Sequence, residues 1–262
     1  MNDKELVSFK KWFADYCASF ATPVQEDERN ISVKQNHTHE VCLNALQIGR
    51  GLRMSRENLL LAETIALFHD VGRFPQYRQY KTFDDSISVN HAALGAKELR
   101  EQKVLEGLPK HDQNLVVHAV ALHNAFSLPE GLDERTRLFT RLVRDADKLD
   151  ILRVFIEYYG QDADSRATAV ALGLPDTPAY SPEILACLAR GEMATKSDLR
   201  TLNDFKLLQL SWLYDMNFPI SLQMVRERRY VDKIATLLPD DDAIREAVES
   251  VQNHVNRKRA EG

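Results

Sequence analysis

Glycine is scarce in this sequence, with only 10 among 262 residues, and no long stretch alternates strictly between apolar and polar residues. Strict alternation is typical of a half-buried strand, so its absence argues against a sheet protein. The longest apolar stretches are interrupted by charges well before about 18 residues, which excludes a transmembrane helix. Apolar residues at helical spacing dominate the rest, and we therefore expect an all-α protein.

Cysteine and excess positive charge are also lacking. The three cysteines, Cys17, Cys42 and Cys187, form no CxxC pair, which argues against a zinc–thiolate site or a disulfide scaffold and for a reducing, cytoplasmic location. The net charge of −5 gives no basic footprint for nucleic acid, and the N-terminus lacks the basic-then-apolar order of a signal peptide. We expect neither nucleic acid nor membrane as a partner.

Helical spacing predicts an N-terminal amphipathic helix and then helices at roughly 37–53, 56–70, 90–105, 111–124 and 133–159. Residues 71–89 contain Gly, Pro and an Asp-Asp pair and are typical of a loop. A second loop-like region, 160–183, follows. We therefore expect a helical core at 1–160 and a C-terminal helical subdomain at 161–262.

The C-terminal part shows two helix-start patterns. Thr201 followed by Asp204 predicts one helix start, and the acidic run at 239–242 predicts the cap of a last helix. The apolar stripe of that last helix comprises Ile244, Val248, Val251 and Val255. These features predict packing, either within a subdomain or at a dimer surface, so a homo-oligomer is one expected state.

Seven of the eight histidines lie between residues 37 and 123. At about 100° per residue, His37 and His39 face nearly opposite sides of one helix, and His37 lies on the apolar side. His37 is therefore the inward candidate, and His39 is expected to be solvated or to support a site from behind. His118 falls among apolar residues and is expected in the core or behind the ligands, whereas His123 lies near a helix end, where a ligand could be exposed.

His91 begins a predicted helix, as either a cap or a ligand, and small residues follow it. Ala92, Gly95 and Ala96 would permit close approach of backbone or ligand. His111 lies beside an aspartate in a polar segment and is most simply a helix-start residue.

His69 and Asp70 stand side by side after the apolar run "ALF", where an unpaired charge is costly. An imidazole and a carboxylate form a ligand pair suited to a divalent metal ion. The alternative is an aspartate at a helix end that pairs with a core histidine.

A second group of charges occurs in "RDADKLD", where Asp147 and Asp150 share one helix face about 60° apart. Such charges are expensive in a core unless something cationic compensates them. Arg144 and Lys148 could do so pairwise, or the carboxylates could belong to a metal cluster.

Together these residues resemble the HD superfamily of metal-dependent phosphohydrolases over roughly residues 35–155. The segment "ALFHDVGRF" is similar to the family signature, in which apolar residues precede HD, Ile or Val, Gly, and Lys or Arg. The resemblance implies an HD-domain helical bundle with additional C-terminal helices. It implies six metal ligands, with Asp70 bridging two ions as in the binuclear branch: His37, His69, Asp70, His91, His123 and Asp147.

The resemblance also implies an enzyme that hydrolyses a phosphate ester or anhydride, in a nucleotide or another small substrate, by means of metal-activated water. Asp70 is then catalytic as well as a ligand, and Arg73 and Lys148 are expected to contact phosphate oxygens and take part in catalysis. The cofactor is one or two divalent ions (Fe, Mn, Co, Ni, Zn or Mg), because imidazole and carboxylate do not select among them.

The sequence departs from two branches of the family. No "GYP" follows His123, where the chain reads "NAFSLPEGL", and the Glu-Asp pair that follows HD in guanosine-tetraphosphate hydrolases is missing. Two other functions stay open. The six-ligand pattern also resembles that of di-iron oxygenases of the same fold, and a non-catalytic module could bind a nucleotide and report it to a partner.

Overall fold

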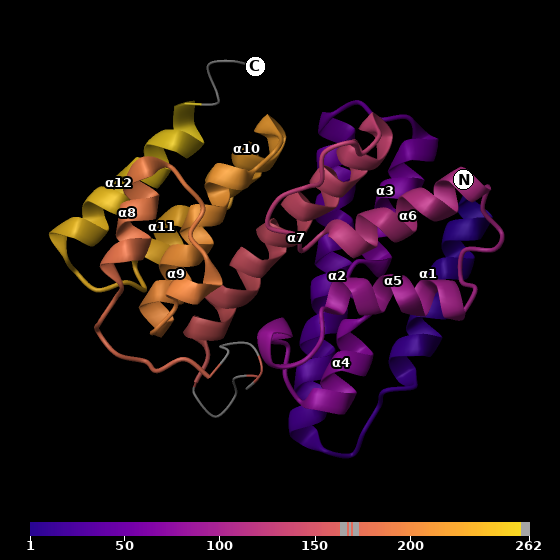
Figure 1. Cartoon of the computed structure of the whole chain (residues 1–262), viewed down its shortest axis with the longest axis horizontal. Helices are drawn as coiled ribbons and strands as arrows, with labels where there is room; N and C mark the ends of the chain where they lie inside the picture. The colour runs from indigo at the N-terminus through magenta and orange to yellow at the C-terminus, as the bar shows by residue number, and fades with distance from the viewer. Residues whose placement is uncertain (163–166, 168, 170–172, 258–262) are drawn as a thin grey trace. The chain divides into compact units, whose positions relative to one another are not determined.

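The computed structural model describes residues 1–162, 167, 169 and 173–257, and these form α-helices and short 3-10 helices with no strand among them (Figure 1). The predicted all-α fold class is confirmed. Within this part of the chain, no helix is both long and apolar enough to cross a membrane. Cys17, Cys42 and Cys187 are all free thiols.

The chain divides into two compact units. The first comprises Met1–Asp150 with Ala167–Leu172, and the second comprises Ile151–Arg166 with Gly173–Gly262. The division falls inside the helix α7 (Glu134–Gly160), which contributes residues to both units. The sequence analysis predicts the boundary after residue 160, where this helix ends.

The first unit consists mainly of helices that pack in pairs. α2 lies along α3, α5 lies along α6, and α3 also contacts α1 and α6 (Figure 1). Besides α7, its elements are α1 (Asp3–Ala18), α2 (Gln25–Gly51), α3 (Arg56–Phe68), α4 (Arg73–Tyr80), η1 (Asp85–Ile87), α5 (His91–Glu101) and α6 (Lys110–Leu122). The five predicted helices of this region correspond to α2, α3, α5, α6 and α7, although α2 begins well before residue 37.

α3 is the central helix of this unit, because every residue from Leu60 to Phe68 is buried. Ser55 caps its N-terminus by accepting a hydrogen bond from the amide of Asn58. A helix that is apolar on nearly all sides must lie inside a bundle. The residues that follow its last turn, His69 and Asp70, are therefore delivered into the interior.

The prediction of a continuous loop at 71–89 is wrong, because α4 and η1 lie within it. Pro75 is the third residue of α4, in the first turn, where the missing amide hydrogen costs no helical hydrogen bond. Gly72 is required by close approach: a Cβ there would lie 2.1 Å from the carbonyl oxygen of His91 and 2.5 Å from the amide nitrogen of Gly95. The expectation that small residues of α5 allow close approach is thus confirmed at Gly95.

The second unit is built around α9 (Leu202–Ser211), of which every residue is buried. Its other elements are α8 (Pro182–Arg190), η3 (Lys196–Asp198), η4 (Trp212–Asp215), α10 (Pro219–Glu227), α11 (Tyr230–Ala235) and α12 (Asp242–Arg257). The predicted Thr201–Asp204 helix start is confirmed as a capping box. Asp241 caps α12 and the predicted apolar stripe of α12 is buried, so that prediction is confirmed as well.

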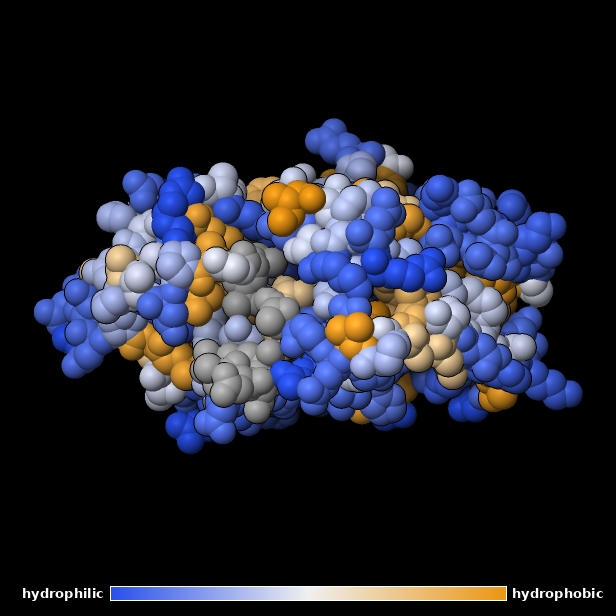
Figure 2. Space-filling model, turned by 90° about the horizontal axis from the view of Figure 1, so that it is seen from below, coloured by the Kyte–Doolittle hydropathy of each residue, from blue (hydrophilic) through white to orange (hydrophobic). Residues whose placement is uncertain are grey.

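Part of the predicted loop 160–183 lies outside the described residues, namely 163–166, 168 and 170–172. At the surface, hydrophobic residues form separate groups among hydrophilic ones in the view of Figure 2. The large hydrophobic side chains that reach solvent in the described chain are Val7, Val24, Leu43, Tyr80, Ile87, Phe126 and Leu138. Scattered apolar side chains of this kind are ordinary on a globular protein.

Candidate metal centre

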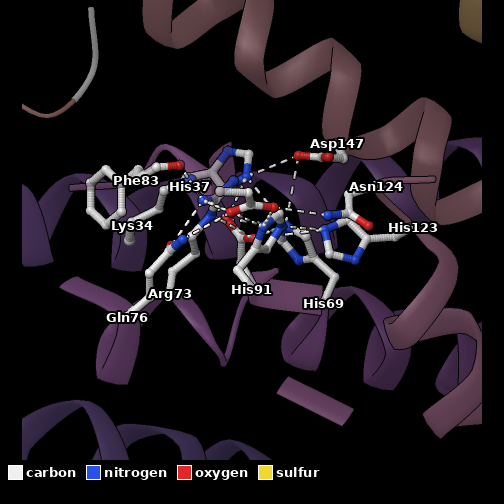
Figure 3. Close-up of polar contacts among 12 residues, drawn as sticks. Lys34, His37, His69, Arg73, Gln76, Phe83, His91, His123, Asn124 and Asp147 are labelled. Carbon is white, nitrogen blue, oxygen red and sulfur yellow. Dashed lines mark hydrogen bonds and ion pairs between the residues drawn. The ribbon is translucent and has the colours of Figure 1, made fainter. Parts of the chain in front are cut away.

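The six side chains expected to bind metal come from separate elements of the first unit and gather in one place (Figure 3). His37 lies on α2, His69 and Asp70 follow α3, His91 begins α5, His123 follows α6 and Asp147 lies on α7. All are buried except Asp147, whose side chain is 15% exposed. Their donor atoms form three overlapping groups, each of which could hold a metal ion.

Two of the histidines are positioned by the same local device. His69 and His123 each directly follow the last residue of a helix, and the Nδ1 of each lies within hydrogen-bond distance of the carbonyl three residues earlier. The distances are 2.7 Å to Ala66 and 2.8 Å to Val120. Helix ends leave carbonyls without partners, and a carbonyl can only accept. Nδ1 therefore carries the hydrogen, and Nε2 presents a lone pair to the interior.

The other two histidines are oriented by carboxylates. His37 Nδ1 lies 2.7 Å from an oxygen of Asp150, and His91 Nδ1 lies 2.7 Å from an oxygen of Asp85. An ionised carboxylate accepts hydrogen bonds, so both imidazoles donate from Nδ1 and also keep Nε2 for the site. A carboxylate behind a histidine fixes its tautomer and orientation and raises its basicity as a metal ligand.

The Nε2 atoms meet in two pairs. His37 and His69 bring theirs to 3.2 Å, and His91 and His123 bring theirs to 3.1 Å. Two neutral nitrogens with lone pairs turned toward each other repel unless a proton or a cation stands near both. Ligand atoms that share one ion lie about 2.0–2.2 Å from it and hence roughly 3 Å from each other. The donor set therefore fits divalent metal ions.

Asp70 faces both pairs with different oxygen atoms. Its Oδ2 lies 3.5 Å from the Nε2 of His37 and 3.7 Å from that of His69. Its Oδ1 lies 3.2 Å from the Nε2 of His91 and 3.7 Å from that of His123. Asp147 lies nearest the first pair, with its Oδ1 3.0 Å from His37 Nε2 and 3.7 Å from His69 Nε2, and it also forms a group with His69 and His123 whose ligand atoms lie within 4.8 Å of one another. The arrangement thus has two halves that share Asp70. The first half contains His37, His69 and Asp147, and the second half contains His91 and His123.

The carboxyl groups of the centre are held in the ionised form. Burial opposes the charge of Asp70, but Lys34 and the surrounding imidazoles outweigh it and hold its pKa well below the usual range. Burial likewise opposes the charge of Asp147, while His37 and His69 lower its pKa well below the usual range. Ionised, buried carboxylates are the form in which acids bind metal.

The two carboxylate-backed histidines differ in basicity. Burial and Lys34 act to lower the pKa of His37, but hydrogen bonds to Asp147 and Asp150 prevail and raise it to about 9. Burial and Arg73 lower the pKa of His91. Without metal, a proton on His37 therefore supplies the positive charge that the close approach of His37 and His69 requires.

Two cations border the centre on the side of Asp70. Lys34 Nζ lies 2.8 Å from Asp70 Oδ2, and Arg73 Nε lies 3.5 Å from Asp70 Oδ1. Arg73 also donates through Nη1 to the side chains of Gln76 and Asp85. These positive charges are suited to an anionic ligand that shares the site with metal.

Asp85 connects four side chains around the second half. It accepts hydrogen bonds from His91, Arg73, Gln76 and Asn124. Burial opposes its charge, but His91 and Arg73 dominate and lower the pKa of this carboxyl. A carboxylate with so many donors is fixed in place, and it fixes His91 in turn.

The structure brings together the six expected ligands and Arg73, which contacts Asp70. Lys148 follows Asp147 in the sequence and is buried on α7, and its expected contact with substrate stays a prediction. Arg144 is buried and donates to the backbone carbonyls of His123 and Ala125, so it supports the turn after α6.

Two expectations about the remaining histidines had different outcomes. His39 is exposed, as expected. The prediction that His118 is buried is wrong: it is exposed, on the same side of α6 as His111 and Asn114. These positions recur at spacings of three and four, which form one helical face, and the apolar neighbours of His118 cover the opposite face.

Sequence reasoning missed Lys34 and Asp85 and did not give Asp150 its place behind His37. Lys34 could have been found, because it precedes His37 by three residues and so shares a face of α2. Asp85 carried no such signal, since its position depends on how the segment after α4 folds back.

The comparisons with known proteins agree with this geometry. The family model of the HD domain matches residues 35–152, a segment that contains all six converging residues. No match was found among the curated proteins or among the solved structures with which the chain was compared. From the family match and the helical fold, we conclude that residues 35–152 of this chain form an HD domain.

Proposed function

We propose that this protein is a metal-dependent phosphohydrolase with two divalent ions in its HD domain. His37, His69, Asp147 and Asp70 Oδ2 would hold one ion, and His91, His123 and Asp70 Oδ1 would hold the other. The observation that carries this proposal is the position of Asp70, which turns one oxygen to each histidine pair. One bridging carboxylate between two sets of neutral imidazoles is suited to two cations that lie close together.

When bound, such ions supply a water molecule of lowered pKa and positive charge for the phosphoryl oxygens. The chain's own groups do the rest. Asp85 and Asp150 hold His91 and His37 in the tautomer that leaves Nε2 free of hydrogen. Lys34 and Arg73 present positive charge next to Asp70, where an anionic substrate would meet them. Lys148, beside Asp147, is proposed as a further contact to phosphate.

The substrate class follows from this charge distribution. A site with two ions and two flanking cations favours a ligand with several negative charges, such as a phosphate ester or anhydride. We propose a nucleotide or another small phosphorylated molecule. The same four imidazoles would also bind iron, so the ligands alone do not distinguish a phosphohydrolase from an oxygenase, and an experiment must do so.

The proposal is tested with protein purified without chelator, by elemental analysis and by phosphate or nucleotide release from a panel of phosphorylated compounds. Mn, Fe, Co, Ni, Zn and Mg are supplied in turn. We expect close to two ions per chain and turnover with at least one metal. We expect Asp70→Asn to lose metal and to lower kcat by more than about 100-fold, because the effect of a shared ligand should exceed that of a residue behind a ligand.

His39→Ala is the matched control, because His39 is exposed on the same helix as His37 and should affect neither metal content nor turnover. Stoichiometric oxygen uptake by the iron-loaded protein, without phosphate release, would favour the oxygenase instead. Tight nucleotide binding without turnover under any metal would point to the non-catalytic module.

A further inference from the structure

Phe83 lies beside the metal centre but offers it no ligand atom. It is 6% exposed and stands in the short segment between α4 and η1. Its ring packs against that of Tyr77, with centroids 5.1 Å apart, in a buried cluster that also includes Phe74. Packing alone accounts for a buried aromatic residue, so the question is what its remaining contacts do.

Both cations that flank Asp70 face this ring (Figure 3). Lys34 Nζ lies 5.2 Å from the ring centroid, and Arg73 Cζ lies 5.8 Å from it. The face of an aromatic ring carries partial negative charge and attracts cations within about 6 Å. The carbonyl of Phe83 also accepts a hydrogen bond from Arg73 Nη1. One residue therefore contacts both cations through its ring and one of them through its backbone.

The two cations carry like charges that repel each other, so their positions depend on their partners. Asp70 contacts both of them, and Arg73 Nη1 also lies 3.0 Å from Asp85 Oδ1, but the imidazole of His91 faces both of these carboxylates as well. A buried aromatic face adds attraction for both without adding a carboxylate, which would repel an anionic ligand. It therefore keeps the cations in place and leaves their charge available.

We propose that Phe83 is a positioning residue that holds Lys34 and Arg73 beside each other so that they bind a phosphate group as a pair. This inference rests on the proposed function, because it takes phosphate as the anion that meets the site. If Phe83 has this role, anion binding requires its aromatic ring and not merely an apolar side chain of similar volume.

The test compares Phe83→Leu, which keeps an apolar side chain, with Phe83→Tyr, which keeps the ring. Phe74→Leu is the matched control: Phe74 lies in the same buried cluster and packs on Phe13, Tyr16 and Phe20. The probe is inorganic phosphate, titrated calorimetrically into the metal-loaded protein. KM and kcat for the best substrate and the metal content of each variant are measured in parallel.

We expect Phe83→Leu to weaken phosphate binding and raise KM by about tenfold, with metal content unchanged, since each of two cation contacts is modest. Phe83→Tyr should retain binding, and Phe74→Leu should lower stability without changing phosphate affinity. In a Lys34→Met background the effect of Phe83→Leu should shrink, because the two residues would act through one contact. Phe83→Met, closer in volume, replaces the leucine variant if that variant does not fold.

Equal phosphate affinity in wild type and Phe83→Leu would overturn this inference and leave the proposed function standing. Loss of metal together with loss of phosphate in Phe83→Leu would also overturn it, since Phe83 would then act by packing the segment that carries Asp85. A metal-loaded wild type that binds no phosphate and hydrolyses no phosphate compound would overturn both proposals.

Discussion

At the scale of single residues, the centre depends on which nitrogen of each histidine carries hydrogen. All four imidazoles turn Nδ1 to an acceptor, a backbone carbonyl for His69 and His123 and a carboxylate for His37 and His91. The carbonyl is supplied by the helix that precedes the histidine and comes with the local fold. The carboxylate comes from a side chain on another element, Asp150 on α7 for His37 and Asp85 on η1 for His91, and can be changed without replacing the histidine.

Asp85→Asn should therefore weaken metal binding selectively in the half that contains His91. We expect affinity there to fall by about 10–100-fold, because the amide neither fixes the tautomer of His91 nor raises its basicity. Titration of metal against a chromophoric chelator measures this loss. Asp84→Asn is the matched control, since Asp84 caps η1 through Ser86 and contacts no histidine in the described structure. Equal metal affinity in the two variants would refute the role given to Asp85.

Individual site residues were predictable to the extent that helix geometry decides where they point. The phase of His37 against His39 on one helix indicated which faced inward, and that outcome is confirmed for both. His118 was misplaced because its apolar neighbours cover the far side of the helix. Asp85 and Phe83 could not be predicted, because no periodic pattern governs the segment that contains them. That the six converging residues bind metal remains a prediction.

At the scale of elements, the close crossing of α4 and α5 places Asp70 next to His91. Gly72 begins α4 against the first turn of α5, where the backbone of His91 and Gly95 leaves no room for a side chain. The sequence predicts a loop at Gly72 and Pro75, because glycine and proline occur both in turns and at helix starts. Whether they form a turn or begin a helix depends on the packing of α5 against them.

Gly72→Ala should separate these two helices and damage the second half of the centre. Because the added Cβ would meet backbone atoms that cannot rotate away, we expect a loss of about 3 kcal/mol in the free energy of unfolding, together with weaker metal binding. Denaturant unfolding and metal titration measure the two effects. Gly107→Ala is the control: a Cβ there meets nothing within 4 Å, and we expect stability unchanged or raised by about 0.5 kcal/mol. A Gly72→Ala protein as stable as wild type would show that the crossing can relax.

At the scale of the whole molecule, the proposed ligands and both flanking cations lie in the first unit, which also contains most of the HD match. The fold class could be predicted because helical spacing and capping patterns are local properties of the sequence, and the division at residue 160 stays a prediction. The compact units divide inside α7, and local spacing in a sequence gives no sign of a boundary inside a continuous helix.

The centre also makes the stability of the metal-free protein depend on pH, and we expect metal binding to depend on pH in the opposite direction. In the metal-free protein, burial and Lys34 act against protonation of His37, but Asp147 and Asp150 prevail and raise its pKa to about 9, above the value of 6.5 for a free side chain. A raised pKa gives stability that is fully present below about pH 6.5 and is lost as the pH rises through about 9. Asp70 and Asp147, with lowered pKa values, give the opposite: stability present above about pH 4 and lost as the pH falls.

We therefore expect the metal-free protein to be most stable between about pH 4 and pH 6.5, with a melting temperature that declines toward pH 9. Metal must displace the proton of His37, so its binding should release protons and should strengthen as the pH rises to about 9. Thermal unfolding in chelator across this range, and calorimetry of metal binding in buffers of different ionisation enthalpy, measure the two effects. His37→Gln should abolish the alkaline decline, whereas His39→Gln, on the exposed side of α2, should keep it. A metal-free melting temperature that stays flat from pH 6.5 to 9 would mean that no proton occupies the position that we assign to a metal ion.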